Sequence, residues 1–153
     1  MTKCEFIRKL PGFCAPNLET LDLGGCGNLT EVHDNIGLLG KLKYLVLYDC
    51  KKLEILPNNL NLKSLEGLSL AGCKRLKKFP QIHPEMKCLK KLFVNLGGTC
   101  IRKLPSSLRY LTSGLETLWL PKIQNLDLSF AQYGFSSLKY LNLNQFEIGR
   151  AHV

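Results

Sequence analysis

The side chains best suited to chemistry in this sequence are seven cysteines and three histidines. Cys26, Cys50 and Cys73 recur at nearly equal intervals, a pattern that a metal site or a redox relay could also produce. However, the chain has no Cys-x-x-Cys pair, and no histidine lies at metal-ligand spacing. We therefore expect no metal, no cofactor and no disulfide framework. We interpret the three thiols as small buried side chains packed beneath a recurring turn.

The histidines give no indication of an active site. His33, His83 and His152 have no nucleophile or carboxylate at a suggestive spacing, and no cysteine has a histidine partner in the sequence. A G-x-x-x-x-G-K-[ST] phosphate loop is also absent from the sequence. We predict that the chain is not an enzyme and has no catalytic or cofactor-binding residues.

Composition narrows the class of protein further. Of the 153 residues, 45% are hydrophobic and 22% are charged, which is typical of one soluble globular domain and unlike a disordered or collagen-like chain. No apolar run approaches a membrane span, and the charged opening residues do not resemble a signal peptide. We expect a cytoplasmic location, with the nucleus also open, and no membrane partner. The formal net charge of +9 must be interpreted from where the basic residues lie.

The elements that position these residues are indicated by a repeat. The pattern L-x-x-L-x-L begins at residues 18, 42, 65, 89, 115 and 138, within the period of leucine-rich repeats. Because one repeat cannot bury its apolar edge alone, the repeats must stack. We predict an α/β leucine-rich-repeat solenoid of about six repeats, with a curved parallel sheet on the concave face and short irregular or helical convex segments. The central leucines should be stacked and nearly inaccessible: Leu21, Leu45, Leu68, Leu92, Leu118 and Leu141.

A second block, Cys-x-x-Leu-x-x-Leu-Pro, follows several of the predicted strands in phase. Residues 1–17 are interpreted as the end of a preceding repeat, and residues 18–147 as the solenoid fragment. Residues 148–153 match a translated sequencing adapter, ATCGGAAGAGCACACGTC, and are excluded from the fold. Extra residues at 95–98 and the missing cysteine block in the fifth repeat predict irregular layers.

Two stretches, LEGLSLAGCKRLKKFP from residue 65 and LKKLFVNLGGTCIRKLPSSL from residue 89, carry a family resemblance. They resemble repeats of plant intracellular TIR-type nucleotide-binding leucine-rich-repeat (TIR-NBS-LRR) disease resistance proteins. The resemblance implies a protein-recognition module, used for pathogen effector sensing and for autoinhibition in the defense response. The alternative is an intracellular scaffold of the Ras-group leucine-rich-repeat type. A phosphate loop in the upstream reading frame would favour the receptor, and continued regular repeats would favour the scaffold.

Residues that alternate outward on the predicted strands should line the concave face. Six of them are the candidate partner-binding residues there: Tyr44, Tyr48, Lys91, Phe93, Trp119 and Tyr140. Large aromatic side chains are enriched at interaction hot spots, although these could instead shield one another and the irregular fifth repeat. A shallow saddle of small residues, Gly67, Ser69 and Ala71, is expected between the aromatic groups.

Basic residues cluster after the cysteine positions and should form a ridge on one lateral edge. The predicted ridge consists of Lys51, Lys52, Lys74, Arg75, Arg102 and Lys103. It could dock on an acidic surface, or it could be a solvated flank without a partner. Because no base-reading motif accompanies the charge, we expect no nucleic acid. The expected partners are proteins: a pathogen effector, a guarded host protein or other domains of the same receptor.

Overall fold

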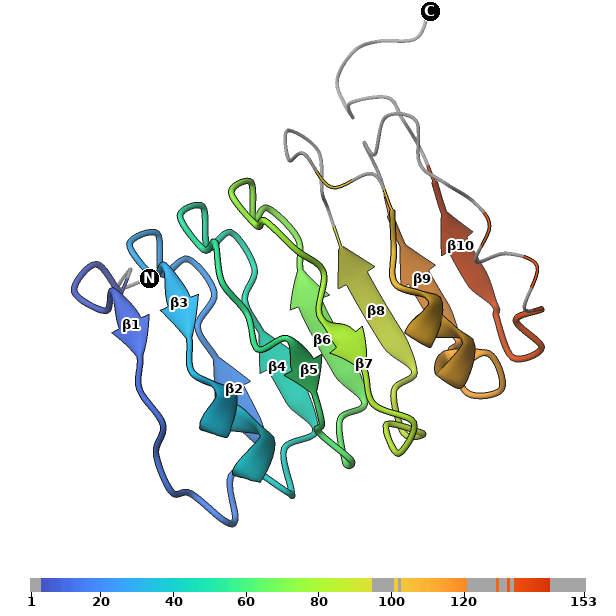
Figure 1. Ribbon diagram of the computed structural model, residues 1–153, viewed down its shortest axis with the longest axis horizontal. Helices are drawn as coiled ribbons and strands as arrows, with labels where there is room; N and C mark the ends of the chain where they lie inside the picture. The colour runs from blue at the N-terminus through green and yellow to red at the C-terminus, as the bar shows by residue number, and fades with distance from the viewer. Residues whose placement is uncertain are drawn as a thin grey trace, which may run out of the picture.

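The computed structural model describes residues 4–94, 101, 103–120, 129, 132 and 134–143. Six short parallel strands form the main sheet, and sequence neighbours are spatial neighbours throughout (Figure 1). They are β2 (Thr20–Asp22), β4 (Tyr44–Val46), β6 (Gly67–Leu70), β8 (Lys91–Val94), β9 (Thr117–Trp119) and β10 (Tyr140–Asn142). One strand arises from each L-x-x-L-x-L pattern, so the predicted leucine-rich-repeat solenoid is confirmed.

The opposite, convex side is built from shorter pieces that lie in front of the sheet in Figure 1. They are β1 (Lys9–Leu10), β3 (Glu31–Val32), β5 (Asn59–Leu60), β7 (Gln81–Ile82) and the 3₁₀ helices η1 (Asp34–Leu38) and η2 (Ser106–Leu111). β1 pairs with β3, and β5 pairs with β7. The first helix begins where His33 Nδ1 accepts a hydrogen bond from the Asn35 N–H at 3.0 Å. These segments fit the short convex elements that the sequence predicts.

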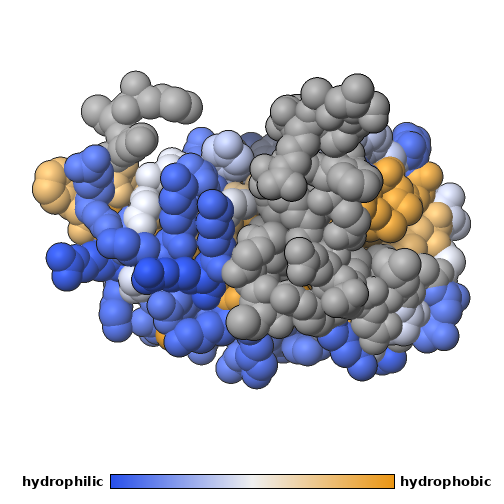
Figure 2. Space-filling model, turned by 90° about the horizontal axis from the view of Figure 1, so that it is seen from above, coloured by the Kyte–Doolittle hydropathy of each residue, from blue (hydrophilic) through white to orange (hydrophobic). Residues whose placement is uncertain are grey.

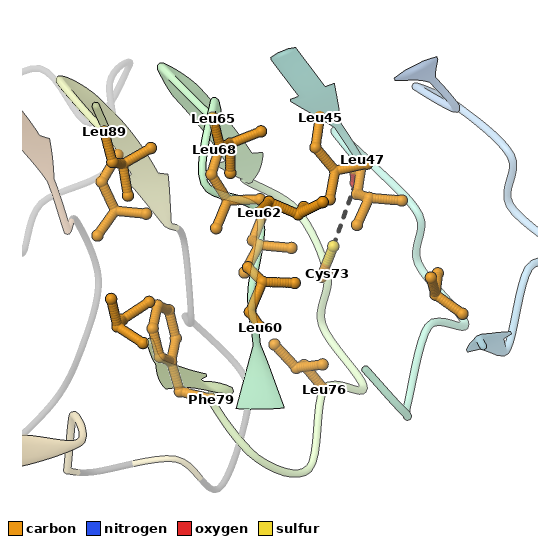
Figure 3. Packing of buried hydrophobic residues seen from close by; sticks show 14 of the residues in the cluster. Leu45, Leu47, Leu60, Leu62, Leu65, Leu68, Cys73, Leu76, Phe79 and Leu89 are labelled. Carbon is orange, nitrogen blue, oxygen red and sulfur yellow. Dashed lines mark hydrogen bonds between the residues drawn. The ribbon is translucent and has the colours of Figure 1, made fainter. Parts of the chain in front are cut away.

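The core is a stack of leucines held in register by the strands. Leu45 pairs with Leu68, and Leu68 with Leu92, so the same repeat position meets itself in each layer. These leucines and Leu118 are at most 1% exposed. Figure 3 shows Leu45 and Leu68 in neighbouring layers, packed among other buried leucines. Each such burial stabilises the fold by roughly 1.5–3 kcal/mol.

The two end members of the leucine column differ from the prediction. Leu141 is 50% exposed, and Leu21 is half-buried, whereas both were expected to be nearly inaccessible. Their strands, β10 and β2, are the outer members of the described sheet, so each has a neighbouring layer on one side only. Burial in a solenoid therefore depends on the neighbouring repeat as well as on the residue type.

The cysteine column lies under the turns, as predicted. The Cys50 thiol donates a hydrogen bond to the Leu23 carbonyl at 3.1 Å, and the Cys73 thiol donates to the Leu47 carbonyl at 3.2 Å (Figure 3). Burial raises the pKa of both thiols to about 12, and burial together with Cys4 raises the pKa of Cys26 to about 11. The neutral thiol thus joins each layer to the one before it.

The residue before each of these cysteines has left-handed backbone geometry. Gly25 and Gly72 have φ of +78° and +82°, which glycine adopts without steric cost. Asp49 occupies the same position with φ of 59°, and it is the one non-glycine residue in the described ranges with positive φ. A side chain at Gly72 would meet Asp49, since an added Cβ would lie 2.9 Å from the Asp49 Oδ1.

The irregular layer predicted at residues 95–98 lies outside the described residues, and so does most of the part of the predicted irregular fifth repeat, residues 115–137, that follows residue 120. So do the interpreted adapter residues 148–153. Within the part of the chain that is described, no helix combines the length and apolar character needed to cross a bilayer.

Candidate functional site

The candidate site is the open face of the main sheet, opposite the leucine core. Because side chains alternate along a strand, two outward rows run across the six strands. The strand register places one row at Thr20, Tyr44, Gly67, Lys91, Thr117 and Tyr140, and the other at Asp22, Val46, Ser69, Phe93, Trp119 and Asn142. Tyr48 lies just beyond β4, where its carbonyl accepts the Gly25 N–H at 2.7 Å. Together these rows form the open sheet face.

Aromatic side chains meet at the β8–β10 end of this face. The Phe93 and Trp119 ring centroids are 6.5 Å apart with an interplanar angle of 59°, a tilted arrangement that aromatic pairs favour. Both residues are half-buried. Tyr140 on the next strand is 51% exposed, and its hydroxyl accepts a hydrogen bond from Asn142 Nδ2 at 3.2 Å. We name Phe93, Trp119 and Tyr140 the aromatic cluster.

The other two predicted tyrosines lie apart from this cluster, on and just after β4. Tyr44 is 42% exposed and Tyr48 is 57% exposed. The Tyr44 ring lies against Gly67, where an added Cβ would come within 3.0 Å of the ring. Its hydroxyl is 3.2 Å from Glu66 Oε2 and donates a hydrogen bond to it. The tyrosines and the aromatic cluster are thus two separate groups.

The small residues of β6 lie between these groups, as the predicted saddle requires. Ser69 pairs with Val46 on one side and with Phe93 on the other, and Ala71 is buried. Lys91 is exposed beside Gly67 in the register. The face therefore offers two aromatic groups, a shallow centre and one lysine.

Four of the predicted ridge residues lie in the turns after β4 and β6, at the upper edge of Figure 1. Lys51, Lys52, Lys74 and Arg75 are all exposed, and we name them the basic edge. Figure 2 looks down on this side of the molecule and shows many hydrophilic residues to the left of the grey atoms, with a hydrophobic patch to their right. Lys51 Nζ lies 3.8 Å from Asp49 Oδ2, and Lys52 Nζ donates to Asn28 Oδ1 at 2.8 Å.

The structure describes one of the remaining two ridge residues. Lys103 lines a groove with Lys77 and Lys78, because Leu104-Pro105 aligns with Phe79-Pro80 and shifts Lys103 past the Lys74 position. Arg102 lies outside the described residues.

A column of alternating charge, which the sequence interpretation missed, runs along the opposite edge. The residue after the first leucine of each repeat is, in order, Glu19, Lys43, Glu66, Lys90, Glu116 and Lys139, and we name these the alternating edge. Lys43 Nζ lies 3.2 Å from Glu19 Oε2, and Lys139 Nζ lies 3.4 Å from Glu116 Oε1. Aligning the six repeats and comparing the residue that follows the first leucine of each would have revealed this column.

Backbone hydrogen bonds hold the alternating edge together as well. The Glu19 carbonyl accepts the N–H groups of Lys43 and Tyr44 at 2.8 and 3.1 Å. The same arrangement recurs at every later layer, ending at the Glu116 carbonyl, which accepts from Lys139 and Tyr140. The backbone hydrogen bonds between successive repeats thus set the spacing of the charged residues along this edge.

Known proteins similar to the chain are plant disease resistance proteins. TMV resistance protein N of Nicotiana glutinosa is 38% identical over 121 residues, which are 78% of this chain and 10% of that protein. Disease resistance protein RPP2A of Arabidopsis thaliana is 38% identical over 112 residues, which are 73% of this chain and 8% of that protein. The chain spans about a tenth of the length of these curated relatives.

A solved leucine-rich-repeat protein of Leptospira interrogans gives a TM-score of 0.34 at 24% identity, over 84% of this chain and 43% of that chain. No family model matches the chain. The fold assignment rests on the repeat pattern and the parallel strand pairing. The sequence matches identify the protein family. The chain therefore belongs to the leucine-rich-repeat regions of plant TIR-NBS-LRR disease resistance proteins.

Proposed function

We propose that this segment is the protein-recognition module of a plant immune receptor, and that its open sheet face binds a pathogen effector or a guarded host protein. The half-exposed pair of Phe93 and Trp119 is the observation that carries this proposal. These rings lie on the side of the sheet opposite the leucine core, and such aromatic anchors supply much of the affinity in protein interfaces. The exposed Tyr140 widens the same patch.

The basic edge supports a second part of the proposal, namely autoinhibition. Lys74 and Arg75 are exposed and form no ion pair with any described residue. An acidic surface on another domain of the same receptor would pair with these cations and hold the receptor inactive. The module acts by binding proteins in the cytoplasm, and this role requires no catalysis, nucleic acid or membrane.

The test uses the complete receptor that carries these repeats, expressed in leaf tissue. Trp119→Ala should abolish resistance to a pathogen isolate that the wild-type receptor restricts, while the receptor still accumulates to the normal level. Lys74→Glu combined with Arg75→Glu should cause cell death without any pathogen, because it removes the autoinhibitory contact.

A matched control places the same charge change elsewhere. Arg8 and Lys87 are both exposed, and neither side chain makes a described hydrogen bond or ion pair. Arg8→Glu with Lys87→Glu should leave resistance and basal signalling unchanged. Unaltered behaviour of both the aromatic and the basic-edge variants would contradict the receptor function and favour a scaffold.

A further inference from the structure

A groove crosses the convex side between the layer of β7 and the layer of η2. It is lined by Lys77, Lys78, Phe79, Gln81, Ile101, Lys103, Leu104, Pro105 and Ser106. All of these residues are described, and none belongs to the open sheet face or to the basic edge. We name this feature the convex groove.

Between the described residues of the two layers, no backbone hydrogen bond crosses the convex groove. Pro80 and Pro105 occupy equivalent positions in the two repeats, and proline has no N–H to donate. Further along, the Ile82 N–H donates a hydrogen bond to the Ser107 Oγ at 2.9 Å and joins the two layers. A smaller recess lies beside Pro57 and Pro80.

The lining of the convex groove combines an apolar floor with a basic rim. Phe79, Ile101 and Leu104 belong to the hydrophobic core and present only their edges to the groove, since each is at most 7% exposed. Lys78 and Lys103 are exposed on the rim. Lys77 also lies there, with its Nζ 2.8 Å from Glu54 Oε2 in the neighbouring layer.

We propose that the convex groove binds an extended acidic segment of a partner protein, with an apolar side chain on the floor and carboxylates at Lys78 and Lys103. Charge complementarity selects this occupant, because the groove is lined by three lysines and no carboxylate, and the chain carries +9. A nucleic acid fits less well, since the one aromatic ring in the groove is buried and offers no face for base stacking.

The test measures fluorescence anisotropy with the full 153-residue chain and a labelled ten-residue peptide. The peptide has a central Leu-Phe pair flanked on each side by four glutamates. Two comparison peptides replace the glutamates by glutamines or the Leu-Phe pair by Gly-Ser. We expect either replacement to weaken binding at least about tenfold, and added salt to weaken binding of the acidic peptide.

Variants then locate the site on the protein. Lys78→Glu with Lys103→Glu should weaken binding of the acidic peptide at least about tenfold. Arg8→Glu with Lys87→Glu changes the net charge equally and should alter the affinity by less than about twofold. Unfolding curves verify that both variants fold, and the single variant Lys78→Glu serves if the double variant does not.

Three results would overturn the proposal. Equal weakening by both double variants would show that only net charge attracts the peptide. Equal binding of the Gly-Ser peptide would remove the role of the apolar floor. Tighter binding of an oligothymidylate, lost in the Lys78 and Lys103 variant, would assign the groove to nucleic acid. Each result is independent of the aromatic cluster, so the proposed function could fail or hold separately.

Discussion

The two lateral edges of the solenoid share one stacking geometry but differ in the signs of the charges that stack along them. On the alternating edge, each repeat carries the charge opposite to that of the repeat before it, as in Glu19, Lys43 and Glu66. On the basic edge, Lys51 and Lys74 hold one repeat position, and Lys52 and Arg75 hold the next. Layers of parallel strands are about 4.8 Å apart, so like charges there repel, whereas the alternating charges attract.

The difference suggests separate roles: the alternating edge contributes to the fold, and the basic edge is a candidate for binding. A solenoid turns any repeat position into a line of neighbouring side chains. Where the charges along such a line alternate in sign, residues in adjacent layers attract each other, and this attraction favours the correct register of the layers. Where the line keeps one sign, the fold tolerates repulsion that an acidic partner would relieve. The basic edge is therefore a better candidate for binding than the net charge of the whole chain suggests.

The largest expected effect concerns the stacking on which both edges depend. Leu68→Ala should lower the free energy of unfolding by about 2–5 kcal/mol, because it removes buried methyl groups and leaves a cavity between two packed layers. Denaturant unfolding followed by circular dichroism measures the change. Leu141→Ala, at a position that is 50% exposed, is the matched control and should cost much less. Equal losses of unfolding free energy in the two variants would contradict the conclusion that central layers are buried more completely than end layers.

The next effect tests whether the basic edge activates the thiols beneath it. Burial raises the pKa of Cys50 and Cys73 to about 12, so at pH 8 both remain neutral and react slowly. Native-state alkylation mapped by mass spectrometry should modify the exposed Cys14 and Cys88 at least about a hundredfold faster. Rapid alkylation of Cys50 or Cys73 in the folded chain would show that the lysines outweigh burial.

A smaller effect distinguishes the two edges directly. Lys43→Glu would place three acidic residues in adjacent layers and should destabilise the fold by about 0.5 kcal/mol, less in high salt. Exchanging the pair, with Glu19→Lys added, removes the repulsion from Glu19 and should recover part of the loss. On the basic edge, Lys74→Glu should be neutral or slightly stabilising in the same unfolding assay. Identical costs at Lys43 and Lys74 would remove the distinction between the edges.

The smallest effect concerns an ion pair between layers, outside both edges. Lys77 donates a hydrogen bond to Glu54 and lowers the pKa of that carboxyl below its ordinary value. A carboxyl with a lowered pKa stabilises the fold above its ordinary pKa and loses this contribution as the pH falls through the folded value. Lys77→Met should therefore reduce stability slightly at neutral pH and leave it unchanged in acid. A loss of equal size at both pH values would contradict this charge linkage.

Much of the fold could be predicted because the repeat is dense in one residue type. The six L-x-x-L-x-L patterns predicted the six strands of the main sheet and their order, and the second block predicted the buried thiols at Cys50 and Cys73. The incomplete burial of Leu21 and Leu141 could not be predicted from a residue pattern, because exposure depends on the layer on either side. Lys103 lines the convex groove with Lys77 and Lys78, because the Leu-Pro pair aligns it with Lys78 and not with the post-cysteine positions of Lys74 and Arg75.

The candidate site was only partly accessible to sequence reasoning. Strand alternation placed Phe93, Trp119 and Tyr140 on one face, and the structure brings the first two into ring contact. Strand alternation could not show that Tyr44 and Tyr48 lie apart from this cluster, because the distance across β6 depends on the sheet. The functions of these residues stay predictions until binding is measured.

By itself, the sequence determined the repeat period, the strand positions and the identity of every column, because a residue's place in the repeat fixes whether it points inward or outward. Only the tertiary structure decided which columns pair across layers, how far the end layers are buried and where a recess opens. Those properties depend on distances between repeats, such as the Lys43–Glu19 contact and the groove lined by Phe79 and Pro105. The physical reason is that stacking brings together residues more than twenty positions apart, whose contacts no single repeat encodes.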